Sequence, residues 1–142
     1  MKEQNLRNHV RYVTLYHFVG AILLLAILIG SVINLATATK ENLYSASLIT
    51  ALTLAVILVG YFARVFALKA QDRAISAEEN FRHFVLTGKP LDKHLNLGQV
   101  IALRFADDEE LPSLAQRAVA ENLNNRQIKK LISAWKADHH RV

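Results

Sequence analysis

The chain lacks cysteine altogether, and it has only two prolines and five glycines in 142 residues. The absence of cysteine excludes disulfides, thiolate metal sites and thiol nucleophiles. Charge is missing over two long stretches, since no Asp, Glu, Lys or Arg lies between Arg11 and Lys40 or between Glu41 and Arg64. These stretches hold 28 and 22 residues, and ~20 apolar residues let a helix cross ~30 Å of hydrocarbon. We therefore expect a membrane protein and not a soluble globular one.

The two uncharged stretches predict two transmembrane helices. We place the first over residues 12–38 and the second over residues 43–63, with residues 1–11 as a short N-terminal segment. Only residues 39–42 separate the helices, which permits a tight turn and hence an antiparallel hairpin. The predicted fold class is all-α.

The basic residues around the hairpin predict its orientation. Cytoplasmic loops of membrane proteins carry an excess of Lys and Arg. Three basic residues precede the first helix, one lies in the turn, and three follow the second helix within ten residues: Lys2, Arg7 and Arg11; Lys40; Arg64, Lys69 and Arg73. Both termini are therefore expected in the cytoplasm, with the turn in the periplasm.

The second helix is expected to continue beyond the membrane. Neither proline nor glycine occurs from Arg64 until Thr87-Gly88-Lys89-Pro90, where glycine favours a left-handed helix cap and proline prevents continuation. Residues 64–87 would then form a cytoplasmic stalk of ~34 Å at 1.5 Å per residue. Residues 91–142 would form a small helical module.

An uncharged stripe with alternating three- and four-residue spacing runs along this helix. Its members are Ala46, Ile49, Thr53, Val56, Gly60, Ala63, Ala67, Ala70, Ala74, Ala77, Phe81 and Phe84. This is the period of a left-handed coiled coil, and small residues let helices approach closely in a membrane. The predicted helix–helix interface is its later part: Gly60, Ala63, Ala67, Ala70, Ala74, Ala77, Phe81 and Phe84.

Two partners for the uncharged stripe stay open. It can pack within the chain, on the small residues Ala26, Gly30 and Asn34 of the first span and on the apolar residues Leu114, Ala118 and Ile132 of the C-terminal module. It can equally meet a second copy or another subunit of a membrane complex.

Capping motifs predict three short helices in the C-terminal module. Asn96 with Gln99, Asp107 with Glu110, and Asn124 with Gln127 each place a capping residue three positions before Glu or Gln. Helix-spaced apolar residues follow each motif: Val100, Ile101 and Phe105; Leu111, Leu114, Ala115, Ala118, Val119 and Leu123; Ile128, Leu131, Ile132 and Trp135. The acidic run Asp107-Asp108-Glu109-Glu110 is accordingly interpreted as a helix start.

No residue pattern indicates catalysis, a cofactor or a metal. His139 and His140 are adjacent and would diverge, and His83 is expected to be a surface or packing residue. Neither span contains a charged residue, which argues against ion-coupled transport. There is no P-loop and no supported Ser/His/Asp set. The sequence thus predicts neither an enzyme nor a cofactor.

The basic residues nearest the membrane suggest lipid contacts. Lys and Arg near an anionic surface contribute ~1 kcal/mol each, and five residues are placed for this role: Arg7, Arg11, Arg64, Lys69 and Arg73. The alternative is an ordinary solvated face. Nucleic acid is not an expected partner, because 13 basic residues from Arg64 onward are offset by 10 acidic ones.

Four segments carry a resemblance to a known family: residues 63–73 (ARVFALKAQDR), 78–84 (EENFRHF), 101–106 (IALRFA) and 138–142 (DHHRV). They resemble a family of small two-span bacterial membrane proteins defined as a domain of unknown function. The resemblance implies a bacterial inner-membrane setting and supplies no activity.

Three functions are compatible with these patterns. The first is a membrane-anchored structural or assembly subunit that self-associates or docks in a larger membrane complex. The second is an accessory or regulatory subunit of a transporter, and the third a membrane-tethered enzyme. The uncharged stripe favours the first.

Overall fold

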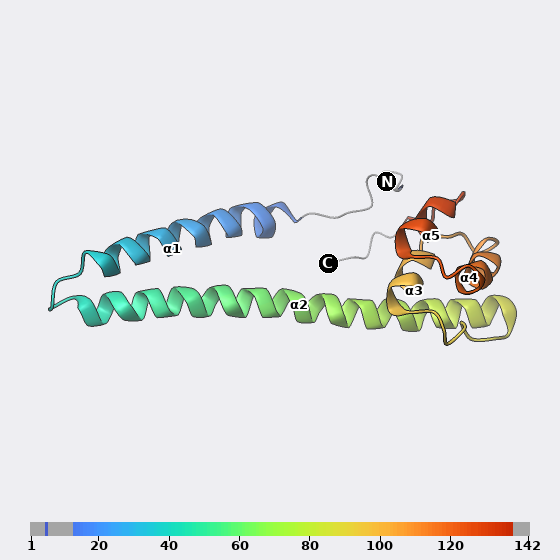
Figure 1. Cartoon of the computed structure of the whole chain (residues 1–142), viewed down its shortest axis with the longest axis horizontal. Helices are drawn as coiled ribbons and strands as arrows, with labels where there is room; N and C mark the ends of the chain where they lie inside the picture. Colours follow the sequence, from blue (N-terminus) through green and yellow to red (C-terminus); the bar gives the residue numbers. More distant parts are fainter. Residues whose placement is uncertain (1–4, 6–12, 138–142) are drawn as a thin grey trace. The chain divides into compact units, whose positions relative to one another are not determined.

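The computed structural model describes residue 5 and residues 13–137, and its elements are all helical (Figure 1). They are the π-helix η1 (Leu15–Gly20), α1 (Ala21–Ala36), α2 (Leu43–Thr87), α3 (Leu97–Leu103), α4 (Leu111–Ala120) and α5 (Asn125–Leu131). No β-strand occurs among the described residues. The prediction of an all-α chain is confirmed, with the second long helix running on to Thr87.

The chain forms two compact units that meet within the sequence of α2. Residues 12–66 belong to the hairpin unit, and residues from Ala67 onward belong to the cap unit. The hairpin unit contains η1, α1 and the first part of α2. The cap unit contains the rest of α2 together with α3, α4 and α5.

In the hairpin unit, two cross-helix hydrogen bonds establish the antiparallel arrangement. The Thr50 hydroxyl donates to the Ser31 carbonyl at 3.1 Å, and the Tyr16 hydroxyl donates to the Gly60 carbonyl at 3.2 Å. Ser31, late in the first helix, thus meets Thr50, early in α2. Tyr16, early in the first helix, meets Gly60, which lies further along α2. Four residues of α1 that are less exposed than their neighbours share one face at helical spacing: Leu24, Leu28, Ser31 and Leu35.

This contact differs from the small-residue match expected from the sequence. Ala26, Gly30 and Asn34 are all exposed, and a Cβ atom added to Gly30 would meet nothing within 4 Å. The less exposed residues are instead Leu24, Leu28, Ser31 and Leu35 on α1, and Ala46 and Thr53 on α2. The burial pattern therefore does not use Gly30 as a close contact.

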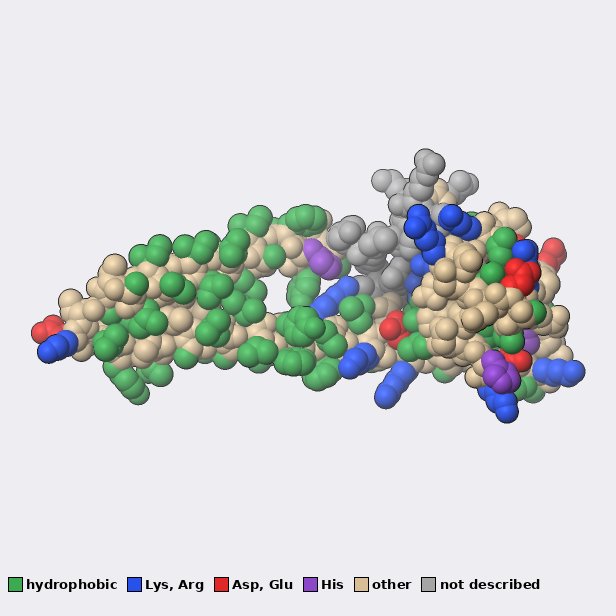
Figure 2. All heavy atoms as spheres, viewed as in Figure 1, with side chains coloured by type: hydrophobic (Ala, Val, Ile, Leu, Met, Phe, Trp, Pro, Cys, Tyr) green, Lys and Arg blue, Asp and Glu red, His purple; other side chains and the backbone are tan. Residues whose placement is uncertain are grey.

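In the hairpin unit, most serine and threonine hydroxyls bond to the backbone of their own helix, while apolar side chains are exposed. Six Ser and Thr hydroxyls donate to carbonyls one helical turn earlier: Ser31, Thr37, Ser45, Ser47, Thr50 and Thr53. Figure 2 shows hydrophobic side chains covering the visible surface of these helices. Such back-bonding leaves few unmet polar groups, which suits an apolar environment.

The cap unit has its own hydrophobic core. It is formed by Ala102, Leu103, Phe105, Ala106, Leu111, Leu114, Ala115, Ala118, Leu123, Ile128 and Ile132. The largest of these, Phe105, is fully buried and lies 5.0 Å, centroid to centroid, from Trp135. The three short helices are therefore packed together without using the uncharged stripe of α2.

Local signals explain most helix ends in the cap unit. Gly88 adopts φ 72° and donates its N–H to the Phe84 carbonyl at 2.7 Å, as expected for the end of α2. Asn96 with Gln99 and Asn124 with Gln127 both form complete capping boxes. The predicted starts of α3 and α5 are confirmed.

The predicted capping box of Asp107 and Glu110 is wrong. Helix α4 starts at Leu111, and its N-cap Glu110 makes no side-chain capping bond. The Glu110 carboxylate accepts instead from the N–H of Ser133 at 3.1 Å and from its hydroxyl at 3.0 Å. Pro112, in the first turn of α4, has no N–H to be capped, so Glu110 is available for this distant partner.

The position of Trp135 also differs from the prediction. Helix α5 ends at Leu131, and Ile132 is extended with ψ 118°. Trp135 then lies opposite Ala106, where the Lys136 N–H donates to the Phe105 carbonyl at 2.8 Å. The helical spacing of Trp135 in the sequence was coincidental, because packing on Phe105 and pairing with Ala106 stabilise the extended chain.

We expect Ala70→Pro to interrupt α2 near the start of the cap unit. Proline removes one ladder hydrogen bond and clashes with the preceding turn, at a cost of ~3 kcal/mol or more. Circular dichroism and thermal unfolding of the full chain should show lost helicity and a lower melting temperature. Ala70→Ser at the same exposed site is the control and should cost under ~1 kcal/mol.

Candidate functional site

The uncharged stripe is largely exposed in the cap unit. Ala70, Ala74, Ala77, Phe81 and Phe84 are all exposed, and Ala67 is half-buried. The two phenylalanines have 67% and 50% of their surface accessible, and the adjacent Val85 has 66%. In the hairpin unit Gly60 is half-buried and Ala63 exposed. Of the two partners considered, packing on the chain's own C-terminal module is therefore not observed for this face.

Within the cap unit, the residues after α2 pack on a different face of that helix. Ile75 and His83 are buried there, and the Arg82 side chain is only 13% exposed. Positions 75, 79, 82 and 83 share one face of a helix with 3.6 residues per turn. The stripe residues Ala74, Ala77, Phe81 and Phe84 alternate with them in sequence and point elsewhere. The stripe thus stays largely exposed, although Ala74 borders a pocket that α2 forms with the rest of the cap unit.

Arg82 connects α2 to the turn that precedes α4. Its Nε donates to Asp108 Oδ1 at 2.6 Å, and a second guanidinium nitrogen donates to the Ala106 carbonyl at 2.8 Å. The third nitrogen donates to Glu79 at 2.9 Å, one turn earlier on α2. The planar guanidinium fork can satisfy several acceptors at once. This explains why a cationic side chain is placed at the contact.

The same contact changes the acidity of Asp108. The hydrogen bond from Arg82 lowers the pKa of the Asp108 carboxyl below its ordinary value of 3.8, and the charges of Arg82 and Lys136 act in the same direction. A carboxylate with a lowered folded-state pKa stabilises the fold above its unfolded pKa, and this contribution is lost as the pH falls through the folded value. The Asp108 side chain is 53% exposed, so solvent weakens the effect.

Polar side chains of α2 hold the loop that follows it. Asn80 accepts the Leu91 N–H at 2.9 Å, and a ring nitrogen of His83 lies 2.8 Å from the Lys89 carbonyl oxygen. Thr87 bonds the same carbonyl at 3.1 Å. We expected His83 to be a surface or packing residue. It is a packing residue, because it is buried and contacts this loop. Reversal of the chain after Gly88 thus depends on three side chains of the last turns of α2.

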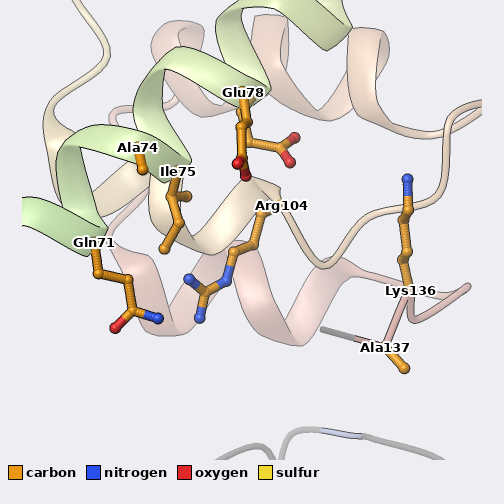
Figure 3. A pocket seen from close by; sticks show the side chains of 8 residues that line it. Gln71, Ala74, Ile75, Glu78, Arg104, Lys136 and Ala137 are labelled. Atoms are coloured by element: carbon orange, nitrogen blue, oxygen red, sulfur yellow. The ribbon is translucent and has the colours of Figure 1, made fainter. Parts of the chain in front are cut away.

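A pocket of about 320 Å³ lies between α2 and the rest of the cap unit. It is lined by Gln71, Ala74, Ile75, Glu78, Glu79, Arg104, Lys136 and Ala137. Figure 3 shows the Arg104 side chain extending in the direction of Gln71 and Ile75. Its guanidinium carbon also lies 4.5 Å from the centroid of the Phe105 ring, within cation–π range.

The pocket combines side chains of both charge signs. Two carboxylates and two cations line it, together with one amide. Serine, threonine and histidine are absent from the lining, and no group of three His, Asp or Glu suited to a metal occurs among the described residues. The arrangement can hold polar groups in place, and its lining shows no Ser, Thr or His that could form a hydroxyl–imidazole pair.

The basic residues predicted to contact lipid are found in different settings. Arg64 is half-buried, with its guanidinium carbon 6.0 Å from the centroid of the Tyr16 ring. Lys69 and Arg73 are exposed. Arg7 and Arg11 lie outside the described residues, as do His139 and His140. Their lipid contacts stay a prediction.

Arg82 and the Glu110–Ser133 contact had no role in the sequence-based interpretation. Arg82 was one charge among several on the predicted stalk, and nothing in its spacing indicates a partner 24 or 26 residues away. The position of Arg82 opposite the stripe was a weak signal, because a charge on the covered face of a helix needs a partner. The spacing of Asp107 and Glu110 matches a capping box. The sequence therefore does not indicate the hydrogen bond between Glu110 and Ser133.

Comparison with known proteins identifies a family. The whole chain, residues 1–142, matches a Family of unknown function (DUF6526). The chain belongs to this family. The match confirms the resemblance to a domain of unknown function, and it carries no organism, membrane setting or activity. Neither a curated protein nor a solved structure matches the chain.

We expect Arg82→Ala to destabilise the cap unit. It removes bonds to Asp108, Ala106 and Glu79, and we expect a loss of about 1–2 kcal/mol, because Asp108 is half-exposed. Chemical unfolding of the full chain measures the loss. The difference from wild type should shrink below about pH 4 as Asp108 protonates. Arg126→Ala, at an exposed arginine of α5, should change stability by less than ~0.5 kcal/mol; equal losses would contradict the proposed role of Arg82.

Proposed function

We propose that this protein is a membrane-anchored assembly subunit, which uses the exposed stripe of α2 to associate with itself or with a larger membrane complex. The observation that carries the proposal is the exposure of Phe81, Phe84 and Val85 on a helix whose other face already packs on the cap unit. Exposed apolar side chains gathered on one face mark an interaction surface.

The membrane anchor is supported by the two long apolar helices. Two segments are long and apolar enough to cross a membrane, Leu15–Ala36 and the first part of Leu43–Thr87. Only 6% and 11% of the residues in their most apolar windows are buried within the chain. The core helix of a soluble protein would be largely buried. Lipid is the environment that suits side chains such as Leu23, Leu52 and Val59, all more than half exposed.

We further propose that both termini face the cytoplasm of a bacterial cell, with the inner membrane as the site. The support is the distribution of basic residues, six flanking the hairpin on its open side against one, Lys40, in the turn. Arg64 and Lys69 are the described basic residues nearest the membrane on the cytoplasmic side, where anionic lipids attract them.

Single cysteines in this cysteine-free chain test the orientation. We expect Lys40→Cys to react with an impermeant maleimide added to intact cells, and Lys93→Cys in the cap unit to react only after the cells are opened. Both lysines are exposed, so burial does not protect either site. Labelling of intact cells at position 93 and not at 40 would invert the assignment.

The assembly function rests on a stripe that needs a neighbour at short range. Alanines at 70, 74 and 77 allow another helix to come close, and the phenylalanines beyond them provide apolar area. An exposed stripe of this kind on a free monomer would leave the phenylalanines in water. A transporter-associated role would use the same surface, with a many-span protein as the partner.

We expect Ala77→Leu to weaken the assembly of the full chain extracted in mild detergent. Extra methylene groups overpack a close helix contact at about 1–3 kcal/mol. Native mass spectrometry measures the assembled fraction, and thermal unfolding should show no loss for the isolated monomer. Ala77 suits the test better than Ala74, because Ala74 also lines the pocket.

Ala120→Leu is the matched control, since Ala120 is an exposed alanine on α4 away from the stripe. It should leave the assembled fraction unchanged. A wild-type protein that is purely monomeric in membranes and in mild detergent, with no co-purifying partner, would refute the assembly function.

A further inference from the structure

From the exposed face of α2 we infer that the partner of this stripe is a second copy of the same chain, in a parallel and in-register coiled coil with an interchain ion pair between Arg73 and Glu78. The inference rests on the proposed assembly function, and it specifies the partner, its direction and its register. Three observations carry it: the heptad period of the stripe, the apolar side chains exposed on it, and the charges that flank it.

The stripe defines a heptad register for the cap-unit part of α2. Its spacing alternates three and four residues, so Ala67, Ala74 and Phe81 occupy the a positions and Ala70, Ala77 and Phe84 the d positions. The exposed Val85 follows Phe84 at an e position and widens the apolar surface. Residues Ile75, Arg82 and His83, which contact the cap unit, fall at b and c positions. The seam of a coiled coil therefore lies on the largely exposed face of α2, with Ala74 at the edge of the pocket.

Membrane anchoring gives two copies the same direction. Each copy enters the cytoplasm from the same side of the bilayer through α2, so two neighbouring α2 helices run parallel. In a parallel pair, a g residue on one helix faces the e residue five positions later on the other. Arg73 is at g and Glu78 is at e, and these positions are five residues apart.

The two charges that this register brings together are complementary and available. Arg73 and Glu78 are both exposed, and neither forms an ion pair with any other described residue, although Glu78 also lines the pocket that holds Arg104 and Lys136. Glu79 and Arg82, by contrast, are used within the chain. Two-fold symmetry would create two Arg73–Glu78 pairs, one on each side of the Ala74 and Ala77 layers.

The position of Arg73 fits an ion pair better than a lipid contact. It lies nine residues beyond Arg64, or ~14 Å along the helix, whereas the headgroup region adds only ~5–8 Å to each side of the hydrocarbon. A slip by one heptad would place Arg73 opposite Gln71 or Val85, so the ion pair would be lost, because no other Arg–Glu pair occupies g and e positions of this stretch. The charges therefore select the in-register pair.

Disulfide trapping of the full chain in membranes tests the partner. Ala77→Cys, at a d position, should give a covalent dimer on mild oxidation, because d residues of two parallel copies face each other. Lys69→Cys, an exposed c-position control, should give at least about tenfold less dimer. Absence of the Ala77 crosslink would overturn the homodimer, even if Ala77→Leu still disrupts assembly. That combination would leave the assembly function standing with a different partner.

Charge reversal in the Ala77→Cys background tests the register. Arg73→Glu and Glu78→Arg should each lower the crosslinked fraction about three- to tenfold, since each replaces two attractions by two repulsions of surface strength. The double reversal should restore the wild-type fraction. Crosslinking that ignores both single reversals, or singles that are not rescued by the double, would overturn the Arg73–Glu78 pairing. An unchanged melting temperature in dilute detergent would show that the variants keep the monomer fold.

Discussion

A single uninterrupted helical ladder, that of α2, supports both compact units of the chain. Its early part provides Ala46, Thr50 and Gly60 for contact with the first helix, and its late part provides Ile75, Arg82 and His83 for contact with the cap unit. The ladder forms because its 45 residues contain no proline and only one glycine, Gly60. Gly88 ends it where α2 has provided its last contacts. Each unit folds against its own stretch of this helix.

Within the cap unit, polar side chains on α2 determine how the short helices are attached. Arg82 reaches the carbonyl of Ala106 and the carboxylate of Asp108, and Asn80 receives the N–H of Leu91. Bonds to a backbone have a defined geometry, whereas apolar packing alone tolerates sliding. The short helices are consequently attached to one face of α2, and the opposite face, with Phe81 and Phe84, stays exposed.

Sequence-based prediction succeeded where the signal was local. Gly88 and the capping boxes of Asn96 and Asn124 act within four residues, and all three behave as predicted. It failed where a residue had a choice of partners. Glu110 could cap its own helix or bond Ser133, and Trp135 could extend α5 or pair with Ala106. In both cases the distant contact prevailed, because it satisfies groups that the core places nearby.

The sequence by itself determined the helical class, the two apolar helices, the length of α2 and the period of the uncharged stripe. These properties depend on composition and spacing along one chain segment. Only the tertiary structure decided which face of α2 is covered. That outcome depends on contacts between residues distant in the sequence, such as Arg82 with Ala106, 24 positions apart. No local sequence pattern contains the free energy of such contacts. The exposure of Phe81 and Phe84 follows from that choice.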